Sequence, residues 1–326
     1  MRSMLGENIE CFDMRILITG ASGFIGKACL PAFVNAGYQV RACSRHQVDQ
    51  PHVEYVNIPA ISGDTDWSTA LQDIDVVIHL AGIAHAPKTE RHLYHDVNVK
   101  GTCKLLLDAI EAKVQHFIFV SSIAVHGRTH TALVDEHTQF QPENAYAQSK
   151  LDAELAIQNI SADHQISWTI LRPPMVYGMH APGNFDRLIK LVKTGIPLPL
   201  YGARSLRSYI SVDNLVSCLL TITKSDKARN NCFVVSDDND ISTAELIMRI
   251  AELMGKPPRL WWFPETGLKW AGLVTGYIEE IKKLFDPFQI NCSKLKNELG
   301  WIPVISLKNG LQQAIITRNS NLKESS

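Results

Sequence analysis

Short apolar runs alternate with stretches of helical periodicity along the first half of the chain, beginning at Met14. The apolar runs are rich in Val, Ile and Leu and are bounded by polar or turn-forming residues. Strands are therefore predicted at 15–19, 39–43, 53–57, 75–81, 116–122 and 168–174. Helical periodicity is clearest at 24–36, 98–113 and 146–160.

Strands that are apolar on both faces are typical of a parallel sheet covered by helices on both sides. Helices between such strands form right-handed crossovers. Residues 14–175 therefore predict an α/β fold built on a doubly wound parallel sheet.

The pattern changes after about residue 175, where Pro, Gly and aromatic residues become frequent. We interpret 176–207 and 237–317 as a smaller C-terminal substrate-binding portion, with 208–236 returning to the sheet. Its expected helices lie at about 184–194, 213–224, 242–254 and 306–317. Residues 1–13 are interpreted as a flexible extension or an upstream start, and 318–326 as a frayed tail.

The composition is that of a globular protein with a core, at 45% hydrophobic and 20% charged residues. A net charge of −1 lacks the basic field that nucleic-acid binding requires. Seven cysteines and twelve histidines show no metal-ligand spacing, so no metal is expected. Free thiols and the lack of a long apolar run favour a cytoplasmic protein without a membrane span.

A glycine-rich turn, ITGASGFIGKA, follows the first predicted strand and opens the first helix. Gly20 permits a tight turn, Gly23 lets the backbone approach a pyrophosphate, and Gly26 allows close packing of helix and sheet. The helix N-terminus would then bind the anion with its unpaired N–H groups. This strand–turn–helix context predicts a dinucleotide site.

The end of the second strand indicates which dinucleotide is bound. NAD sites tend to place a carboxylate there for the ribose 2′-hydroxyl, but this chain has Ser44 and Arg45. A hydroxyl and a cation suit a 2′-phosphate. The sequence therefore favours NADP(H), with NAD(H) as the alternative.

Tyr146 and Lys150 lie four residues apart in the stretch YAQSK. On a helix this spacing places both side chains on one face. An ammonium beside a phenol favours the phenolate, so the pair could donate and accept a proton. On these five residues alone, an ordinary helix surface is the better explanation of the pair.

Further stretches place the pair in a wider pattern: HLAG (79–82), DVNVKGT (96–102), VSSIAVHG (120–127) and LRPPMVYG (171–178). Together with the glycine turn, they resemble the extended branch of the short-chain dehydrogenase/reductase superfamily. That branch contains NAD(P)-dependent nucleotide-sugar epimerases, dehydratases and reductases. The resemblance extends from Met14 to about Leu311 and implies a Rossmann-like fold.

The resemblance implies a catalytic role for Tyr146 as the proton donor and acceptor at a sugar carbon that exchanges hydride. Lys150 would lower the pKa of this phenol from about 10 and bind the nicotinamide ribose. Counting back from Gly127 places the catalytic hydroxyl at Ser122, which would hydrogen-bond the reacting oxygen. Asn98 is expected to tie loops together.

The resemblance also implies which residues contact the dinucleotide. They lie in the glycine turn, at strand ends and in the Tyr/Lys pair: Gly20, Ser22, Gly23, Phe24, Ile25, Gly26, Ser44, Arg45, Asn57, Ile58, Leu80, Ala81, Gly82, Tyr146, Lys150 and Pro173.

A UDP-hexose is the substrate class that the resemblance implies. Asn184 begins a helix whose N-terminus would face the pyrophosphate, and Arg207 in RSYISVDNL would contact a phosphate or ribose, with Tyr209 packing beside it. His85 would line the sugar pocket, together with Ser122.

One departure from the epimerase pattern affects the choice of reaction. UDP-galactose epimerases carry a second Arg near FDPFQINCSK, and this chain has none there. Lys282, Lys283 or Arg204 could compensate. The same absence occurs in a subgroup resembling UDP-N-acetylquinovosamine dehydrogenase, which ARSLRSYISVDNL also resembles.

The favoured function is therefore 4-ketoreduction of a UDP-4-keto-6-deoxy-HexNAc for surface polysaccharide precursors. The alternative is a UDP-hexose 4-epimerase of the UDP-glucose or UDP-GlcNAc type. A dehydratase would carry Asp-Glu where Ile123-Ala124 stand. A non-catalytic NADP-binding scaffold or redox sensor ranks lower, because Tyr146 and Lys150 are both retained.

Two expectations concern surfaces. A homodimer through the helices at 98–113 and 146–160 is the usual family arrangement. The aromatic stretch LWWFPETGLKWAG (260–272) is expected to pack in the core or at a dimer interface, with a membrane-facing patch as the alternative.

Overall fold

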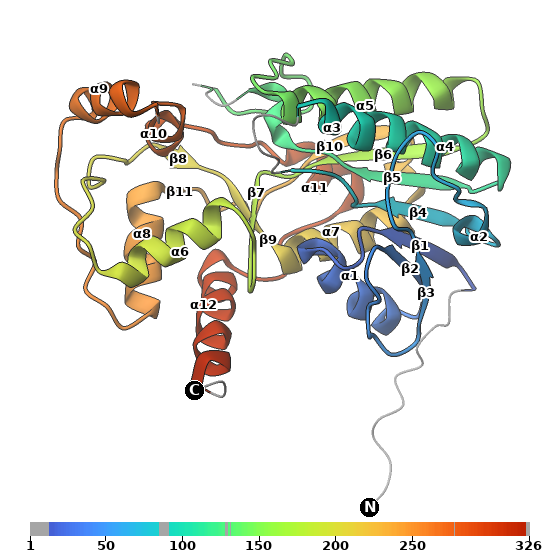
Figure 1. Ribbon diagram of the computed structural model, residues 1–326, viewed down its shortest axis with the longest axis horizontal. Coiled ribbons are helices and arrows are strands. Elements are labelled where there is room, and N and C mark those ends of the chain that lie inside the picture. The colour runs from blue at the N-terminus through green and yellow to red at the C-terminus, as the bar shows by residue number, and fades with distance from the viewer. Residues whose placement is uncertain (1–12, 85–90, 128–129, 131, 277, 324–326) are drawn as a thin grey trace, which may run out of the picture. The chain divides into compact units, whose positions relative to one another are not determined.

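The computed structural model describes residues 13–84, 91–127, 130, 132–276 and 278–323 (Figure 1). The chain forms two compact units, each assembled from segments that are far apart in sequence. Unit 1 contains Met1–Val120, Ser149–Ile170 and Thr223–Asn231. Unit 2 contains Ser121–Gln148, Leu171–Ile222 and Cys232–Ser326.

The strands are β1 (Arg15–Thr19), β2 (Gln39–Ser44), β3 (Val53–Asn57), β4 (Val76–His79), β5 (His116–Val120), β6 (Ser167–Arg172), β7 (Met175–Tyr177), β8 (Leu206–Arg207), β9 (Tyr209–Ser211), β10 (Asn231–Val234) and β11 (Ile241–Ser242). The α-helices are α1 (Phe24–Asn35), α2 (Ser68–Leu71), α3 (Arg91–His95), α4 (Gly101–Glu111), α5 (Ala145–Ala162), α6 (Asn184–Thr194), α7 (Val212–Lys224), α8 (Thr243–Leu253), α9 (Glu265–Thr275), α10 (Ile278–Phe285), α11 (Ser293–Leu299) and α12 (Leu307–Lys323). A π-helical turn, η2 (Asp96–Lys100), precedes α4, and the short 3₁₀ helices are η3 (Ile123–His126) and η4 (Asp226–Ala228).

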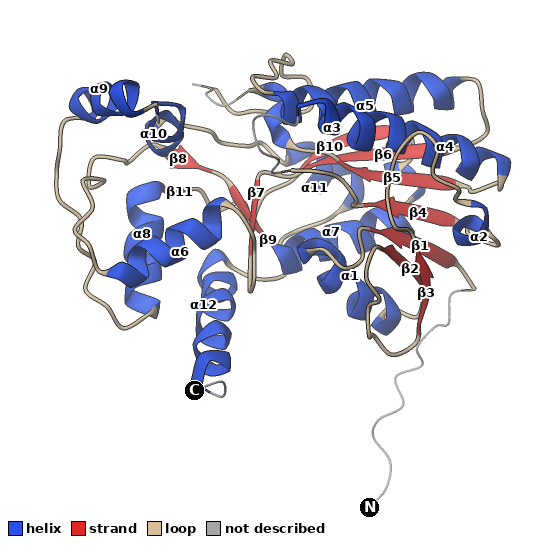
Figure 2. Ribbon diagram, in the orientation of Figure 1, coloured by secondary structure: helices blue, strands red, loops and turns tan. Residues whose placement is uncertain are grey.

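The central sheet has seven strands in the order β10-β6-β5-β4-β1-β2-β3. The pairs from β3 through β2, β1 and β4 to β5 run parallel, with Ile16 opposite Val40 on one side and Val76 on the other. Every residue of β4 and β5 is buried, as expected for strands covered on both faces. Figure 2 shows α4 and α5 on one side of the strands and α1 on the other. The predicted doubly wound α/β fold is confirmed.

The strands begin close to the predicted residues, but β4 and β5 end earlier than predicted, at His79 and Val120. After β4, the Ala81 N–H donates to Thr19 Oγ1 beside the glycine turn. After β5, Ser122 is the N-cap residue of η3. The helix predicted at 98–113 starts instead with η2, and β10 extends the sheet beyond β6.

Unit 1 is closed by hydrogen bonds between its three segments. The buried ring Nε2 of His116 lies 2.8 Å from Thr169 Oγ1, which donates to the Ala228 carbonyl at 2.6 Å. The Asn230 N–H donates to the Trp168 carbonyl. Thus β5, β6 and the segment after α7 share one buried polar contact.

Unit 2 is built around a buried carboxylate. Asp237 accepts hydrogen bonds from Tyr177 Oη at 2.6 Å, Asn214 Nδ2 at 2.7 Å and the Ser211 N–H at 3.0 Å. Asn214 also donates to the Ile305 carbonyl and accepts from its N–H. This network joins β7, β9, α7 and the segment before α12.

Two pairs of short strands complete unit 2, namely β7 with β9 in parallel and β8 with β11 in antiparallel orientation. A separate apolar cluster contains Ile123, Val134, Val234, Phe288, Ile290 and Cys292. The helix expected at 306–317 continues to Lys323.

The aromatic stretch at 260–272 does not lie in the core. Trp261, Trp262 and Trp270 are exposed, so the expectation of core packing is wrong for these three side chains. The surrounding segment also forms the helices α9 and α10, which the irregular pattern of charged and small residues did not predict.

Candidate active site

The glycine turn brings β1, α1 and the end of β4 into close backbone contact. Gly20 has a φ of +68°, and a Cβ there would lie 2.8 Å from the Ala81 backbone nitrogen. A Cβ at Gly26 would lie 2.6 Å from Ala21 Cα. Both positions therefore require glycine. Gly26 packs against the turn itself rather than only against the sheet, which refines its predicted role.

The turn leaves the start of α1 without a side-chain cap. Gly23 occupies the N-cap position, and the first turn of α1 contains no acidic residue. The N–H groups of such a terminus suit an anion. Ser22, Phe24 and Ile25 are half-buried here.

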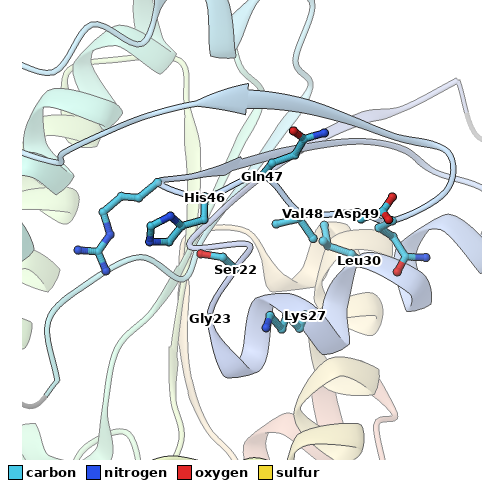
Figure 3. A pocket seen from close by; sticks show the side chains of 10 residues that line it. Ser22, Gly23, Lys27, Leu30, His46, Gln47, Val48 and Asp49 are labelled. Carbon is cyan, nitrogen blue, oxygen red and sulfur yellow. The ribbon is translucent and has the colours of Figure 1, made fainter.

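A cavity of about 640 Å³ lies beside this turn. Its lining residues come from the turn, α1 and the loop after β2: Ser22, Gly23, Lys27, Leu30, Arg45, His46, Gln47, Val48, Asp49 and Gln50. Figure 3 shows the loop after β2 running over α1, with His46 near Ser22 and Val48 near Leu30.

Two cations line this cavity, Arg45 and Lys27. Both are exposed, and neither side chain forms a hydrogen bond or an ion pair with the described part of the chain. Asp49 is the acidic residue of the lining. Lys27 was missed by sequence reasoning, although its position directly after Gly26 could have indicated it.

Ser44 is placed differently from the sequence expectation. Its side chain is buried, and its Oγ donates to the His46 carbonyl at 2.6 Å. The hydroxyl thus shapes the loop that carries Arg45. Asn57 is exposed, and the N–H of buried Ile58 donates to the Ser44 carbonyl.

The segment after β4 is held by two buried polar side chains. The Ala81 N–H donates to Thr19 Oγ1, which lies 2.7 Å from His79 Nδ1. Asn98 in η2 accepts from the Ile83 N–H at 2.8 Å and donates to the Ile83 carbonyl and to Ser149 Oγ. Asn98 therefore ties this loop to α5, in the way the sequence suggested. Leu80, Ala81 and Gly82 form the loop itself.

Lys150 is an almost fully buried ammonium. Its Nζ donates to the Val120 carbonyl at 2.8 Å and lies 4.5 Å from the centre of the Phe119 ring. Burial lowers the pKa of Lys150 to about 8, against an opposing effect of the Glu154 carboxylate. A Cβ built on Gly82 would lie 3.6 Å from Lys150 Nζ. The ammonium therefore lies beside the loop after β4.

The aromatic side of this site is fully buried. The Phe119 ring stacks on His79, with ring centres 5.8 Å apart. Burial and the Lys150 charge lower the pKa of His79 to about 3, which keeps its ring neutral. Phe119 was missed by sequence reasoning, because a Phe in a buried strand has the pattern of ordinary core.

Tyr146 lies in the first turn of α5, one helical turn before Lys150. The spacing of four residues places both side chains on the same face of this helix. Tyr146 is half-buried.

Ser122 is the N-cap residue of η3, and its Oγ accepts a hydrogen bond from the Ala124 N–H at 3.2 Å. The end of η3 is anchored by His126, whose Nε2 accepts from Arg172 at 3.1 Å and whose ring stacks on Phe140. Pro173 is buried and accepts from the Ile123 N–H. These contacts hold Ser122 on a rigid turn.

The predicted substrate residues fall in separate parts of unit 2. Asn184 is the exposed first residue of α6. Arg207 in β8 donates to the Asp286 carbonyl and lies 5.8 Å from the Phe288 ring centre, and Tyr209 is buried beside it. His85 lies outside the described residues.

The structure therefore gathers the predicted dinucleotide residues of unit 1 around the carboxyl ends of β1 to β5. Ser122, Tyr146, Pro173, Asn184 and Arg207 belong to unit 2. Within the described residues, no group of three or more His, Cys, Asp or Glu side chains could hold a metal ion.

Comparisons with known proteins give the family. The NAD dependent epimerase/dehydratase family matches residues 16–235. The UDP-glucose 4-epimerase of Vibrio cholerae is 34% identical over 307 residues, which cover 91% of this chain and 93% of that protein. The N-acetyl-alpha-D-glucosaminyl-diphospho-ditrans,octacis-undecaprenol 4-epimerase of Escherichia coli O157:H7 is 28% identical, covering 74% of this chain and 72% of that protein.

Among solved structures, the UDP-glucuronic acid 4-epimerase from Bacillus cereus in complex with NAD superposes with a TM-score of 0.80. The two chains are 23% identical, and the match covers 96% of this chain and 98% of that chain. At this identity the likeness concerns the fold. The chain belongs to the NAD dependent epimerase/dehydratase family, which confirms the resemblance to the extended short-chain dehydrogenases.

Proposed function

We propose that this protein is a UDP-hexose 4-epimerase. The relative at 34% identity over nearly the whole chain carries that activity in its name, which reverses the order of the two functions favoured by the sequence. The structural observation that carries the proposal is Lys150, a buried ammonium one helical turn from Tyr146 that donates to a single acceptor of the described chain.

The residues of unit 1 fit a nicotinamide dinucleotide. An ammonium has three N–H donors, so two remain for ribose hydroxyls after the bond to the Val120 carbonyl. The uncapped start of α1 suits the pyrophosphate. When bound, the nicotinamide would supply reversible oxidation at C4 of the hexose.

The chain's own residues would then move one proton and hold one oxygen. Tyr146 removes the proton from the C4 hydroxyl and returns it after the sugar has turned over. Lys150 stabilises the phenolate by its charge. The two side chains stay adjacent because they lie on the same face of α5. Ser122, fixed at the start of η3, hydrogen-bonds the C4 oxygen and stabilises the charge that develops there.

A 4-ketoreductase that uses NADP(H) is the second candidate. Arg45 and Lys27 line one cavity, and neither side chain forms an ion pair with the described residues. Two cations suit a 2′-phosphate. The absence of a second Arg in the segment FDPFQINCSK also supports the reductase, as in the sequence comparison above. In this segment the Asp286 carbonyl accepts a hydrogen bond from Arg207.

One experiment separates these two reactions. Purified protein is incubated with UDP-glucose and UDP-GlcNAc deuterated at C4, and separately with a UDP-4-keto-6-deoxy sugar and NADPH. Epimerisation that keeps the deuterium, without net loss of NADPH, supports the epimerase. Stoichiometric NADPH oxidation with the keto-sugar, and no isomerisation of either UDP-sugar, supports the reductase instead.

Tyr146→Phe tests the catalytic assignment in either case. Turnover should fall by roughly two to four orders of magnitude, while the dinucleotide still binds. Undiminished turnover would remove Tyr146 from the mechanism. Absence of turnover in the wild type, with intact dinucleotide binding, would favour the non-catalytic scaffold.

The cofactor preference is tested by binding of NAD⁺ and NADP⁺ to the wild type and to Arg45→Ala and Lys27→Ala. If the cavity holds the 2′-phosphate, each variant weakens NADP⁺ binding roughly tenfold and leaves NAD⁺ binding nearly unchanged.

We also propose a homodimer through α4 and α5, supported by Leu107 and Leu155, which are exposed on these helices. Leu107→Asp with Leu155→Asp should yield a monomer in analytical ultracentrifugation. The cytoplasmic location inferred from the free thiols stays a prediction.

A further inference from the structure

Helix α9 exposes three large apolar side chains. Trp270, Leu273 and Val274 are 69%, 68% and 67% exposed, and their spacing places them on one side of the helix. The charged residues of α9, Glu265 and Lys269, form an ion pair with each other at 2.5 Å. Large apolar side chains gathered at this exposure mark an interaction surface rather than scattered surface residues.

Two glycines of α9 lie close to neighbouring side chains. A Cβ at Gly272 would lie 2.6 Å from Ile281 Cδ1 of α10, and one at Gly267 would lie 2.7 Å from the Phe263 ring. Gly272 therefore packs against α10, and Trp270, two residues earlier, lies on the opposite side of the helix. Gly267 lies three residues before Trp270, so Phe263 packs near the start of the Trp270 side.

The loop that leads into α9 also exposes aromatic side chains. Trp262 is 66% exposed and Trp261 is 46% exposed. The Trp261 N–H donates to the Leu198 carbonyl, and the Tyr201 N–H donates to the Trp261 carbonyl, so the loop is held in place by backbone pairing.

The flank of this loop is basic. The sequence from Leu253 to Pro264 contains Lys256 and Arg259 and no acidic residue. Lys256 donates to the Lys193 carbonyl and Arg259 to the Gly195 carbonyl at the end of α6. Because these acceptors are carbonyls, neither bond neutralises the positive charge, and both residues are exposed.

We propose that α9 and the loop 256–263 dock on the surface of a lipid bilayer that contains anionic lipids. Trp, Leu and Val side chains that protrude from a helix enter the boundary between headgroups and acyl chains, where Trp is enriched. Lys256 and Arg259 would attract the anionic headgroups.

Other occupants fit less well. A second copy of this surface, related by a two-fold axis, would bring the same basic flanks together. A peptide ligand is usually anchored in grooves or pockets, whereas these side chains protrude. In the described part of the chain, no helix is long and apolar enough to cross a membrane. The proposal does not depend on the reaction catalysed.

The test is flotation of the purified full chain with vesicles of phosphatidylcholine, with and without phosphatidylglycerol. The wild type should float with the anionic vesicles. Trp270→Ser combined with Leu273→Ser should lower the partition coefficient roughly tenfold on both vesicle types. Lys256→Gln combined with Arg259→Gln should lower it by a similar factor on anionic vesicles alone.

Ile302→Ser is the matched control, because Ile302 is 67% exposed outside this surface, and it should bind as the wild type does. All of these residues are exposed, so circular dichroism and turnover should stay unchanged. The proposal is overturned if the wild type does not float, or if the control loses as much binding as the Trp270/Leu273 variant. It is also overturned if the wild type forms an oligomer that does not bind vesicles and the Trp270/Leu273 variant is monomeric.

Discussion

Two buried charged side chains, one in each unit, differ in how many hydrogen bonds the protein makes to them. Lys150 in unit 1 and Asp237 in unit 2 are each 5% exposed. Asp237 accepts from three donors of its own unit. Among the described residues, the Lys150 ammonium donates to one carbonyl and lies over an aromatic ring.

We interpret this difference as that between a structural charge and a functional one. A buried ion whose hydrogen bonds are complete joins elements and needs no ligand. A buried ion with donors to spare bears a desolvation cost that a ligand can offset. Burial lowers the pKa of Lys150 and raises the pKa of Asp237, so hydrogen-bond completeness, rather than burial, distinguishes them.

The largest effect should follow from Lys150→Met. The variant removes the charge that stabilises the phenolate, and turnover should fall roughly a thousandfold. The free energy of unfolding should stay the same or rise, because a buried charge is replaced by an apolar chain of similar length. A large loss of stability would show that Lys150 is structural, as Asp237 is.

The pH dependence of the free energy of unfolding should also reflect the buried Lys150 ammonium. The folded pKa of Lys150 is about 8, below its ordinary value of 10.5. Between these pH values the unfolded chain holds a proton that the folded chain has released, so this residue's contribution to stability rises with pH. The wild type should gain about 3 kcal/mol relative to Lys150→Met between pH 8 and 10.5, measured by urea unfolding.

Asp237→Ala should cost about 2 kcal/mol of stability, because it leaves the Tyr177, Asn214 and Ser211 donors buried without their acceptor. Asp237→Asn is the matched control. It keeps one carbonyl oxygen and the shape of the side chain, and should cost much less. Equal losses in the two variants would mean that the charge itself, rather than hydrogen bonding, holds this network together.

The smallest effect is expected from Phe119→Leu. Losing the ring under the ammonium removes about 1 kcal/mol of stabilisation of the charged form. The pKa of Lys150 should fall further, and the alkaline limb of the turnover profile should move to lower pH. Phe117→Leu is the control, because Phe117 is equally buried in the same strand. A shift of the same size in both variants would exclude a specific role for Phe119.

The parts of the fold that depend on local pattern were predictable from sequence. Apolar runs flanked by turns located the strands of the sheet, and the spacing of Gly20, Gly23 and Gly26 located the turn at its centre. The pairing of Tyr146 with Lys150 follows from helical periodicity alone.

Contacts between distant segments were not predictable in this way. Arg207 meets the carbonyl of Asp286, 79 residues away, and nothing local to either residue indicates it. Lys27 indicates an anion site only because Arg45 lines the same cavity. Arg45 lies in the loop after β2, and the course of that loop depends on the buried Ser44 hydroxyl. The hydrophobicity of Trp270 predicted that its side chain is buried. Hydrophobicity alone does not indicate whether a side chain is buried by its own chain or by a binding partner.

The three-segment construction of unit 1 has a consequence during synthesis. Thr169 bonds to the carbonyl of Ala228, and β10 at the sheet's edge begins at Asn231. A ribosome must therefore have translated about two thirds of the message before the nucleotide-binding half can close. Fragments cut at residue 120 or 175 would lack part of that half, and neither would be a dependable module to transplant or express alone.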